Sequence, residues 1–530
     1  MTRPKRAHAA RDSDPPVVGF VSLGCAKNLV DSEKMLGQIA EAGAVITADE
    51  SVADTMVVNT CGFLEAARQE ALDVIRELAE RKRRGELRRI VVVGCLVQRD
   101  GEKLCEIIPE IDALVGVNNR DDVARAIGRS VEPAEPGHAG LPSRRVGSGP
   151  GLQGSAGVSP ASGQAVRDGT GVPLPTLSQP LLAAASRPWR PEREGGGGGH
   201  RLVAGRERGR ADLYLGDYHP QPWTDQGRLR LTPRHYAYVR ISEGCDQKCT
   251  FCTIPSIRGP LHSKPPDALV AECRELIADG ARELILIGQD TTSYGRDRGY
   301  EPGLAGLLRT LDAACDGARW LRLMYAYPSI FSDEMIDTIA ACDRVVKYID
   351  LPLQHINDRV LKAMGRRITR RRTEALLERL RRRIPGVTIR TTFIVGFPGE
   401  TEAEFAELLA FVRDFGFDAL GAFRYSHEPE TPAGRMKNVF DDAVRQERYE
   451  RLMETQREVA LAAARRRVGH TFDVVVDERR ADGVVARHAG QAPEVDSVCR
   501  LVGGPAEPGD WVPVVCTDSD GYDLVVQPRA

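Results

Sequence analysis

The sequence predicts an α/β protein with three domains: a doubly wound N-terminal α/β domain, a central partial (β/α) barrel and a small C-terminal OB-like β-barrel. Three observations predict this architecture. Short apolar runs alternate with helical stretches over residues 17–130 and again over 230–465, and short strand-like runs separated by turns fill 466–530. A chain of 530 residues is long enough for three such domains.

The first three clear strands of the N-terminal domain each end at a cysteine. The runs VVGFVSL, TMVVN and RIVVV lead into Cys25 in SLGCAKN, Cys61 in VNTCGF and Cys95 in VVGCLVQ. In a parallel sheet, ligands collect beyond the carboxyl ends of the strands, and the glycine beside each cysteine lets the backbone approach a bulky group. These residues therefore predict a three-thiolate cluster site, with ordinary buried thiols as the alternative.

Between the first two domains the pattern stops. Residues 131–229 are rich in Gly, Pro, Ala, Ser and Arg and include the run Gly195 to Gly199. Such a composition cannot bury enough apolar surface to offset its ordering entropy, so we expect a disordered linker or insertion, and also a disordered N-terminus over residues 1–16. The alternative is an arm that binds ribosomal RNA through Arg201, Arg206, Arg208 and Arg210.

The strand HYAYVRISEGC opens the central domain and leads directly into a C-x3-C-x2-C loop. Its cysteines are Cys245, Cys249 and Cys252. A cubane iron–sulfur cluster held by three thiolates keeps one iron open for a substrate or cofactor, whereas a structural zinc site needs a fourth protein ligand. The spacing favours the iron–sulfur cluster, and a zinc knuckle with a distant fourth ligand is the alternative.

Other candidate residues of the central domain also stand at strand ends, where the chemistry of a (β/α) barrel is located. The strands ELILIGQD, VVKYIDLPLQH and TIRTTFIVGFPGE end in polar or glycine-rich turns. His355 in PLQH is either a proton carrier or an internally bonded barrel histidine. The residues expected to contact a cofactor are Phe251, Gln289, Asp290, Gly396, Pro398, Gly399 and Glu400, and for the GFPGE turn the alternative is a tight turn without a ligand.

Charge gives a local signal only. The chain has 73 basic and 75 acidic side chains, which indicates neither nucleic acid nor membrane as a general partner. Between residues 470 and 530, however, five Arg and no Lys stand against eleven Asp and Glu, which favours a basic protein over nucleic acid as a partner, and an acidic surface that only keeps the protein soluble is the alternative. No run of 18 apolar residues is present, and the twelve cysteines are read as ligands and buried thiols, so we expect a cytoplasmic protein.

The loop GCDQKCTFC, with Phe251 before its last cysteine, resembles the radical S-adenosylmethionine (radical SAM) signature. Together with SLGCAKN, VNTCGF and VVGCLVQ, it makes the chain similar to the methylthiotransferase family. The resemblance implies two 4Fe-4S clusters and S-adenosylmethionine as cofactors. It implies that the loop cysteines hold one cluster and the N-terminal cysteines the other. The C-terminal barrel resembles a TRAM domain.

Two branches of that family differ in substrate. GQDTTSYG, WLRLMYAYP and YIDLPLQHIND are similar to the branch that modifies an aspartate of ribosomal small-subunit protein twelve. The branch that modifies a transfer-RNA adenosine is the alternative, and a non-enzymatic iron–sulfur or zinc scaffold is a third possibility. Two departures from the family pattern are the length of residues 131–229 and Glu430, which stands where a glycine is typical.

The first branch implies a reaction and its partners. Reductive cleavage of S-adenosylmethionine at the loop cluster gives a radical that removes hydrogen from the aspartate β-carbon, and the methylthio group comes from the second cluster. The implied partners are a basic ribosomal small-subunit protein as substrate and a reducing electron donor such as a flavodoxin-type protein. We expect no membrane partner, and direct nucleic-acid binding is an alternative that the sequence disfavours but leaves open.

Overall fold

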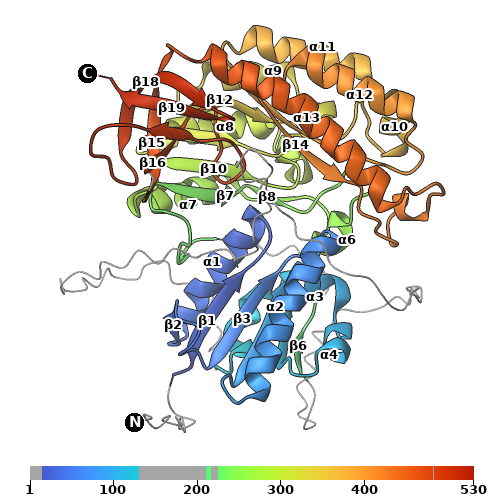
Figure 1. Cartoon of the computed structure of the whole chain (residues 1–530). Helices are drawn as coiled ribbons and strands as arrows, with labels where there is room; N and C mark the ends of the chain where they lie inside the picture. The colour runs from blue at the N-terminus through green and yellow to red at the C-terminus, as the bar shows by residue number, and fades with distance from the viewer. Residues whose placement is uncertain (1–14, 130–210, 217–224, 482, 530) are drawn as a thin grey trace. The chain divides into compact units, whose positions relative to one another are not determined.

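The computed structural model describes residues 15–129, 211–216, 225–481 and 483–529 (Figure 1). The chain divides into two compact units, each described by itself below. The second unit contains Cys25–Glu33, Phe63–Glu65 and the chain from Tyr218 onward, and the first contains the remainder. The expected disordered N-terminus, up to residue 14, and most of the expected linker lie outside the described residues.

The first unit is built on a six-stranded parallel sheet with the order β2-β1-β3-β4-β5-β6. Its strands are β1 (Val17–Ser22), β2 (Val45–Thr47), β3 (Thr55–Thr60), β4 (Arg89–Gly94), β5 (Ala113–Gly116) and β6 (Asp212–Tyr214). The helices of this part of the chain are α1 (Ala26–Glu41), α2 (Glu65–Arg83), α3 (Cys95–Asp100), α4 (Lys103–Ile107), the 3-10 helix η1 (Val117–Asp122) and α5 (Val123–Ala126).

Helices cover both faces of this sheet. Because successive strand residues point to opposite faces, Val91 and Val93 of β4 join a core with Met35 of α1, whereas Val92 joins a separate core with Ile75 of α2. Strands that are buried on both sides consist of continuous apolar runs, as the sequence has here. The prediction of a doubly wound α/β domain is confirmed.

Two pieces of the expected linker are ordered, so the expectation of disorder throughout residues 131–229 is wrong at these places. In the first unit, β6 pairs with β5 as an edge strand. In the second unit, Asp225 and the side chain of Arg228 are buried and form ion pairs. A three-residue strand is too short to show a period, and ion pairs with residues far along the chain leave no local pattern.

The central part of the second unit is a parallel six-stranded sheet with the order β14-β13-β12-β11-β10-β7. Its strands are β7 (Tyr236–Arg240), β10 (Glu283–Ile287), β11 (Trp320–Leu323), β12 (Val345–Asp350), β13 (Thr388–Val395) and β14 (Ala419–Arg424), and a short hairpin pairs β8 (Ser242–Glu243) with β9 (His262–Ser263). The α-helices are α6 (Ile254–Arg258), α7 (Pro266–Ala278), α8 (Gly303–Ala314), α9 (Asp333–Ala341), α10 (Asp358–Ala363), α11 (Arg370–Arg383), α12 (Glu402–Phe415) and α13 (Asp442–Arg466). The 3-10 helices are η2 (Thr291–Ser293), η3 (Arg296–Arg298), η4 (Pro328–Ile330) and η5 (Ala433–Arg435).

The two faces of this sheet have different cores. Leu284 and Leu286 of β10 pack in the large core formed with the helices, whereas Ile285 and Ile287 pack in a smaller core with Tyr236 and other aromatic residues. Six strands alternating with helices form an open (β/α) barrel, as predicted.

The chain ends in a closed barrel of strand order β15-β16-β17-β19-β18. Its strands are β15 (Thr471–Arg480), β16 (Gly483–His488), β17 (Cys499–Leu501), β18 (Trp511–Asp520) and β19 (Asp523–Pro528). The barrel packs on the β10–β12 region of the central sheet, where Arg487 forms a 2.9 Å ion pair with Glu283 and the Tyr348 hydroxyl donates to Asp496. The predicted small β-barrel is confirmed. Each helix in the described part of the chain is too short or too polar to span a bilayer.

Candidate functional site

The three-cysteine loop begins at a glycine that no other residue can replace easily. Gly244 has a φ of 73°, and a Cβ at this position would lie 2.0 Å from the carbonyl oxygen of Pro260. The next residue, Cys245, donates its backbone N–H to the carbonyl of Gly259 at 3.1 Å. The loop therefore turns away from β8 in tight contact with the segment that leads into β9.

The middle of the loop is anchored to two other segments. The Thr250 backbone N–H donates to the carbonyl of Met364 at 2.9 Å, and the Thr250 carbonyl accepts from the N–H of Ala433 at 2.9 Å. Phe251 packs against the apolar cluster that contains Met364 and Tyr425. Phe251, predicted to contact a cofactor, thus anchors the loop by packing.

The thiols of the loop suit an iron–sulfur cluster chemically. Burial raises the pKa of the Cys245 and Cys252 thiols to about 12, because removal from water disfavours the thiolate more strongly than nearby N–H groups favour it. A metal cluster supplies the positive charge that deprotonates such thiols. The Ile254 backbone N–H donates to Cys252 Sγ at 3.5 Å, which is the kind of hydrogen bond that tunes cluster sulfurs.

Two residues beside Cys249 escaped the sequence analysis. Arg366 donates to Cys249 Sγ at 3.6 Å and to the carbonyl of Pro352 at 2.6 Å, and its guanidinium lies 4.0 Å from the ring centroid of Tyr327. The Tyr327 hydroxyl is 3.8 Å from the same sulfur. Both side chains are buried, so a buried cation and a buried hydroxyl face the sulfur of the half-buried Cys249. Tyr327 lies in the quoted motif WLRLMYAYP, but no spacing connects it with a cysteine 78 residues away.

Gln289 and Asp290 hold the flanks of the loop. The Gln289 side-chain amide donates to Glu243, two residues before Cys245. Asp290 accepts from the Gln247 side chain at 2.8 Å and also caps η2 by accepting from the Ser293 backbone N–H. These residues, predicted at a cofactor site, lie next to the cysteine loop and position it.

The GFPGE turn is fixed from within. Gly396 has a φ of 69°, and its N–H donates to Glu400 Oε2 at 2.7 Å. The same carboxylate lies 3.0 Å from His355 Nε2 and 2.6 Å from Arg448, and all three side chains are buried. Gly399 also has a positive φ, and Pro398 is buried. Glu400 therefore stabilises the turn, and His355 is an internally bonded barrel histidine.

Two of the N-terminal cysteines follow neighbouring strands at equivalent positions. Thr60, the last residue of β3, pairs with Gly94, the last residue of β4, and Cys61 and Cys95 come directly after them. A Cβ at Gly94 would lie 2.3 Å from Asn59 Oδ1, and one at Gly62 would lie 2.7 Å from the Cys95 carbonyl oxygen. The two backbones therefore meet closely where the cysteines stand, as the adjacent glycines predict.

Cys25 follows β1, which lies next to β3 in the same sheet. β1 pairs with β3 up to Ser22 and Asn59, and Cys25 precedes α1, where its carbonyl accepts from the Leu29 N–H at 3.0 Å. Among the residues that the structure describes, no three His, Cys, Asp or Glu side chains converge like the ligands of one metal ion. A cubane cluster binds its thiolates through different irons, so it does not require such convergence.

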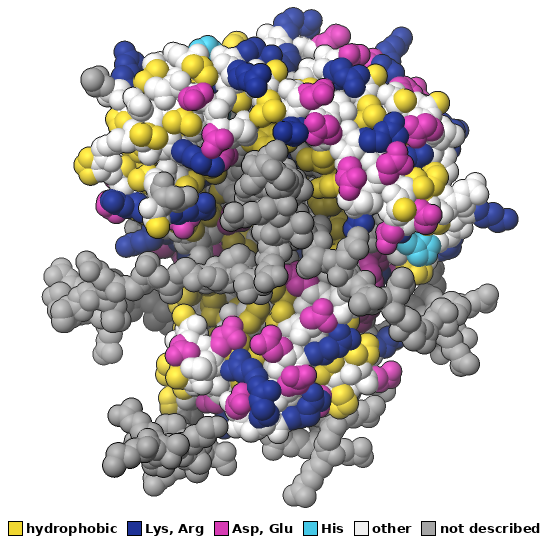
Figure 2. Space-filling model, in the orientation of Figure 1, with side chains coloured by type: hydrophobic (Ala, Val, Ile, Leu, Met, Phe, Trp, Pro, Cys, Tyr) yellow, Lys and Arg dark blue, Asp and Glu magenta, His cyan; other side chains and the backbone are white. Residues whose placement is uncertain are grey.

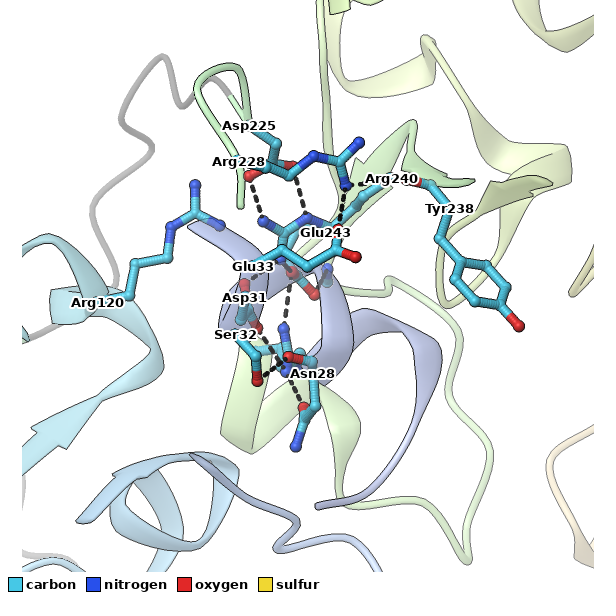
Figure 3. Close-up of polar contacts among 12 residues, drawn as sticks. Asn28, Asp31, Ser32, Glu33, Arg120, Asp225, Arg228, Tyr238, Arg240 and Glu243 are labelled. Atoms are coloured by element: carbon cyan, nitrogen blue, oxygen red, sulfur yellow. Dashed lines mark hydrogen bonds and ion pairs between the residues drawn. The ribbon is translucent and has the colours of Figure 1, made fainter. Parts of the chain in front are cut away.

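A buried ion network anchors the segment that begins at Cys25 within the second unit (Figure 3). At its centre, Arg240 of β7 lies 2.6 Å from Asp31, 2.8 Å from Asp225 and 2.7 Å from Glu243. Arg258 pairs with Glu243 and donates to Asn28 Oδ1 at 2.6 Å. The ionic members, all at most 14% exposed, are Asp31, Glu33, Asp225, Arg228, Arg240, Glu243, Arg258, Lys264 and Glu272.

The network matters for the cysteine loop because of where its members stand. Glu243 is two residues before Cys245 and Asn28 is three residues after Cys25. Removing one partner of a buried ion pair is costly, so the ion pairs of this network favour one arrangement of the two chain segments. Burial also raises the pKa of Glu33, because its partner Arg228 offsets the loss of hydration only in part.

Comparison with known proteins gives matches over nearly the whole chain. The ribosomal protein uS12 methylthiotransferase RimO of Trichlorobacter lovleyi is 39% identical, covering 96% of this chain and 97% of the relative. RimO of Desulforamulus reducens is 38% identical over 96% of this chain and 99% of its own. RimO of Geobacter sulfurreducens is 38% identical over 96% and 97%. The chain belongs to the RimO family.

Three family models divide this chain in the same way as its fold. Residues 17–116 match the Uncharacterized protein family UPF0004, residues 239–412 match the Radical SAM superfamily and residues 468–528 match the TRAM domain. Among solved structures, the radical S-adenosylmethionine methyltransferase TsrM of Kitasatospora setae has a TM-score of 0.50 and 17% identity, covering 79% of this chain and 74% of its own. This likeness concerns the fold alone.

One departure from the RimO pattern has no cost in backbone strain. Glu430 replaces the typical glycine, yet it is not among the described non-glycine residues with a positive φ, which are Tyr325, Gln354, Asn438 and Glu494. The loop around it closes through the Thr431 N–H, which donates to the carbonyl of Glu428 at 3.0 Å. A glycine is therefore not required at residue 430.

Proposed function

We propose that this chain transfers a methylthio group to the β-carbon of an aspartate in the small-subunit ribosomal protein uS12. The observation that carries the proposal is the match to RimO proteins over 96% of the chain at 38–39% identity. The transfer-RNA branch is not favoured, because these full-length relatives all bear the uS12 name. The product is a methylthio-aspartyl residue.

The cofactors are S-adenosylmethionine and two 4Fe-4S clusters. Bound together, they supply a carbon-centred radical that removes a hydrogen atom from an unactivated C–H bond, and a methylthio group that replaces it. The chain's own part is to bind, orient and exclude water. Cys245, Cys249 and Cys252 would hold one cluster, and the flanking contacts of Gln247, Gln289 and Asp290 keep this loop in place.

The second cluster would be held by Cys25, Cys61 and Cys95. Support comes from their positions after three adjacent parallel strands and from the close backbone approach at Gly62 and Gly94. The ion network gives the Cys25 segment a fixed place relative to the strand that leads into the cysteine loop. Such fixing suits a reaction in which a substrate radical must meet a sulfur atom held elsewhere in the protein.

The acidic composition of the C-terminal barrel contributes less to substrate choice than its residue count suggests. Asp477 is held by Arg487 at 2.6 Å and His235 at 2.8 Å, and Asp473 and Asp520 form ion pairs of 3.3 and 3.1 Å with arginines. Paired carboxylates present little net field to a partner. The family match, rather than this charge, therefore carries the assignment of a basic ribosomal protein as substrate.

The remaining parts of the proposal concern surroundings and boundaries. A low-potential reductant such as a flavodoxin-type protein would supply the electron, and the cytoplasm, where ribosomes are assembled, would be the place of action. The proposed domains are residues 17–130, 230–465 and 466–530. The strand β6 is a reason to count residues 212–214 with the first domain.

Mass spectrometry of cells that lack and then regain this gene tests the function. We expect one aspartate of uS12 to gain about 46 Da, hydrogen replaced by a methylthio group, when the gene is restored. The methylthio-adenosine content of transfer RNA should not change. A catalytically dead variant with Cys249→Ala should not restore the mass gain on uS12. A methylthio group that returns on adenosine would assign the chain to the other branch.

A further inference from the structure

A run of cations without any acid follows α10. Six of the eleven residues from 362 to 372 are basic and none is Asp or Glu. Two of the six are used inside the protein, since Arg366 contacts Cys249 and Arg370 forms ion pairs with Glu374 and Glu407. The others are exposed and form no ion pair within the described residues: Lys362, Arg367, Arg371 and Arg372.

This run lies directly beside the cysteine loop. Met364 accepts from the Thr250 N–H, and a Cβ at Gly365 would lie 2.4 Å from the Lys248 carbonyl oxygen. Met436 packs in the same apolar cluster as Met364. Three more exposed cations therefore border the same area, and with the first four they form what we call the basic rim: Lys248, Lys362, Arg367, Arg371, Arg372, Arg435 and Lys437.

Acids near the rim are fewer and partly engaged. Asp246 accepts from the Leu261 N–H at 3.0 Å, and Asp358 accepts from the Arg370 N–H at 2.6 Å. Glu430 is the third acid of these segments. Over the described surface that Figure 2 shows as a whole, Lys and Arg are interspersed with Asp and Glu. The rim is thus a local excess of positive charge in a chain with a formal net charge of −2.

We propose that the basic rim docks on the phosphate backbone of ribosomal RNA, so that the enzyme engages its substrate protein within the small subunit. This inference rests on the proposed function. A ribosomal protein is itself basic and would be repelled by the rim, whereas the RNA around it is a polyanion. Exposed arginines that are not committed to carboxylates can each bind a phosphate through two parallel hydrogen bonds.

Binding to protein-free small-subunit ribosomal RNA, measured over a series of salt concentrations with the cluster-loaded full chain, tests the rim. The variant carries Arg367→Gln, Arg371→Gln and Arg372→Gln. The matched control carries Arg382→Gln, Arg465→Gln and Arg466→Gln, three arginines that are also exposed and without an ion pair in the described residues. Each lost phosphate contact lowers the log–log salt slope by about 0.7–0.9, so we expect the rim variant to lose about 2 in slope and about tenfold in affinity.

The control should stay within about twofold of wild type in RNA affinity, because its cations lie elsewhere on the chain. Equal losses in both variants would overturn the proposal, since binding would then follow net charge alone. The proposal would also be overturned if the wild-type protein did not bind this RNA, or if it bound phosphatidylglycerol vesicles and not the RNA.

A second readout separates the rim from the proposed function. Methylthio transfer is measured with isolated uS12 and with the intact small subunit as substrates. The rim variant should match wild type on the isolated protein and be about tenfold slower on the subunit at low substrate. If wild type modified neither substrate, the proposed function would fail, and the RNA-binding comparison would still decide the role of the rim.

Discussion

The two cysteine sets of this chain are constructed in opposite ways. Cys245, Cys249 and Cys252 stand within eight residues of one loop, whereas Cys25, Cys61 and Cys95 follow three different strands and are spread over 71 residues. The loop is held by contacts around it, such as those of Thr250 with Met364 and Ala433. The dispersed set depends on the register of a parallel sheet, as in the pairing of Thr60 with Gly94.

The difference separates two kinds of dependence on folding. A loop site needs only a local turn and a few anchors, so its ligands remain near one another when distant parts of the chain change. A site assembled from strand ends exists only when the sheet has formed, because the strands that carry its ligands are joined through long-range pairing. Substitutions in one cysteine set should therefore leave cluster binding at the other set intact, and a separate measurement can report on each set.

Removing one set at a time should have the largest effect. Wild type should contain about eight irons per chain, because each three-thiolate set fits a four-iron cluster. Replacing Cys25, Cys61 and Cys95 together by Ala should halve the iron and abolish methylthio transfer, while reductive cleavage of S-adenosylmethionine continues. Replacing Cys245, Cys249 and Cys252 should also halve the iron but should abolish both reactions. Iron analysis and 5′-deoxyadenosine production measure these outcomes, and unchanged iron in the first variant would refute the N-terminal ligand assignment.

Much of this comparison could be predicted from the sequence, for a physical reason. Apolar β-branched runs predict strands reliably because both faces of a parallel sheet are buried. The strands predicted in this way place Cys61 and Cys95 at the carboxyl ends of neighbouring strands. Arg240 could not be identified in this way. Its partners Asp31 and Asp225 are 209 and 15 residues away, and only the tertiary fold brings them together.

Roles were harder to predict than positions. Glu400 was expected to contact a cofactor because it follows a glycine-rich turn, but its oxygens are used by the Gly396 N–H, His355 and Arg448. Similarly, β6 is not predicted from the sequence, because an edge strand can be held by backbone hydrogen bonds without a regular pattern of apolar side chains. A deletion of the insertion should therefore spare residues 211–229, since β6 and Asp225 belong to ordered structure.

Two glycines offer a finer contrast between the sets. Gly244→Ala should clash with the Pro260 carbonyl, 2.0 Å from the added Cβ, and lower cluster occupancy at the loop. Gly94→Ala should clash with Asn59 Oδ1 at 2.3 Å and lower occupancy at the strand ends. Gly85→Ala is the control, because its φ of 75° is similar and nothing lies within 4 Å of the added Cβ.

The control should lose only about 1–2 kcal/mol of stability from left-handed backbone strain, with both clusters retained. Thermal denaturation and iron content read out the three variants together. Gly244→Ala should resemble a partial version of the loop-cysteine variant, and Gly94→Ala a partial version of the strand-end variant. If Gly85→Ala lost as much iron as either, backbone strain alone would explain the effect and the close contacts would not matter.

The smallest effect should come from the cation beside the loop. Arg366→Gln removes the guanidinium 3.6 Å from Cys249 Sγ, and Arg367→Gln is its matched control, one residue further along and exposed. A charged hydrogen bond contributes about 1.5–3 kcal/mol, and loss of a fraction of this should slow S-adenosylmethionine cleavage by about fivefold. A cation near the cluster favours its reduced state, so the midpoint potential of the loop cluster should fall in Arg366→Gln and stay constant in Arg367→Gln. Potentiometric titration followed by electron paramagnetic resonance measures the midpoint potential in both variants.

The second cluster is the internal control. Arg366 contacts Cys249 of the loop, so the cluster at the strand-end cysteines should keep its potential. A shift in both clusters would mean that Arg366→Gln acts through the fold rather than through the Cys249 sulfur.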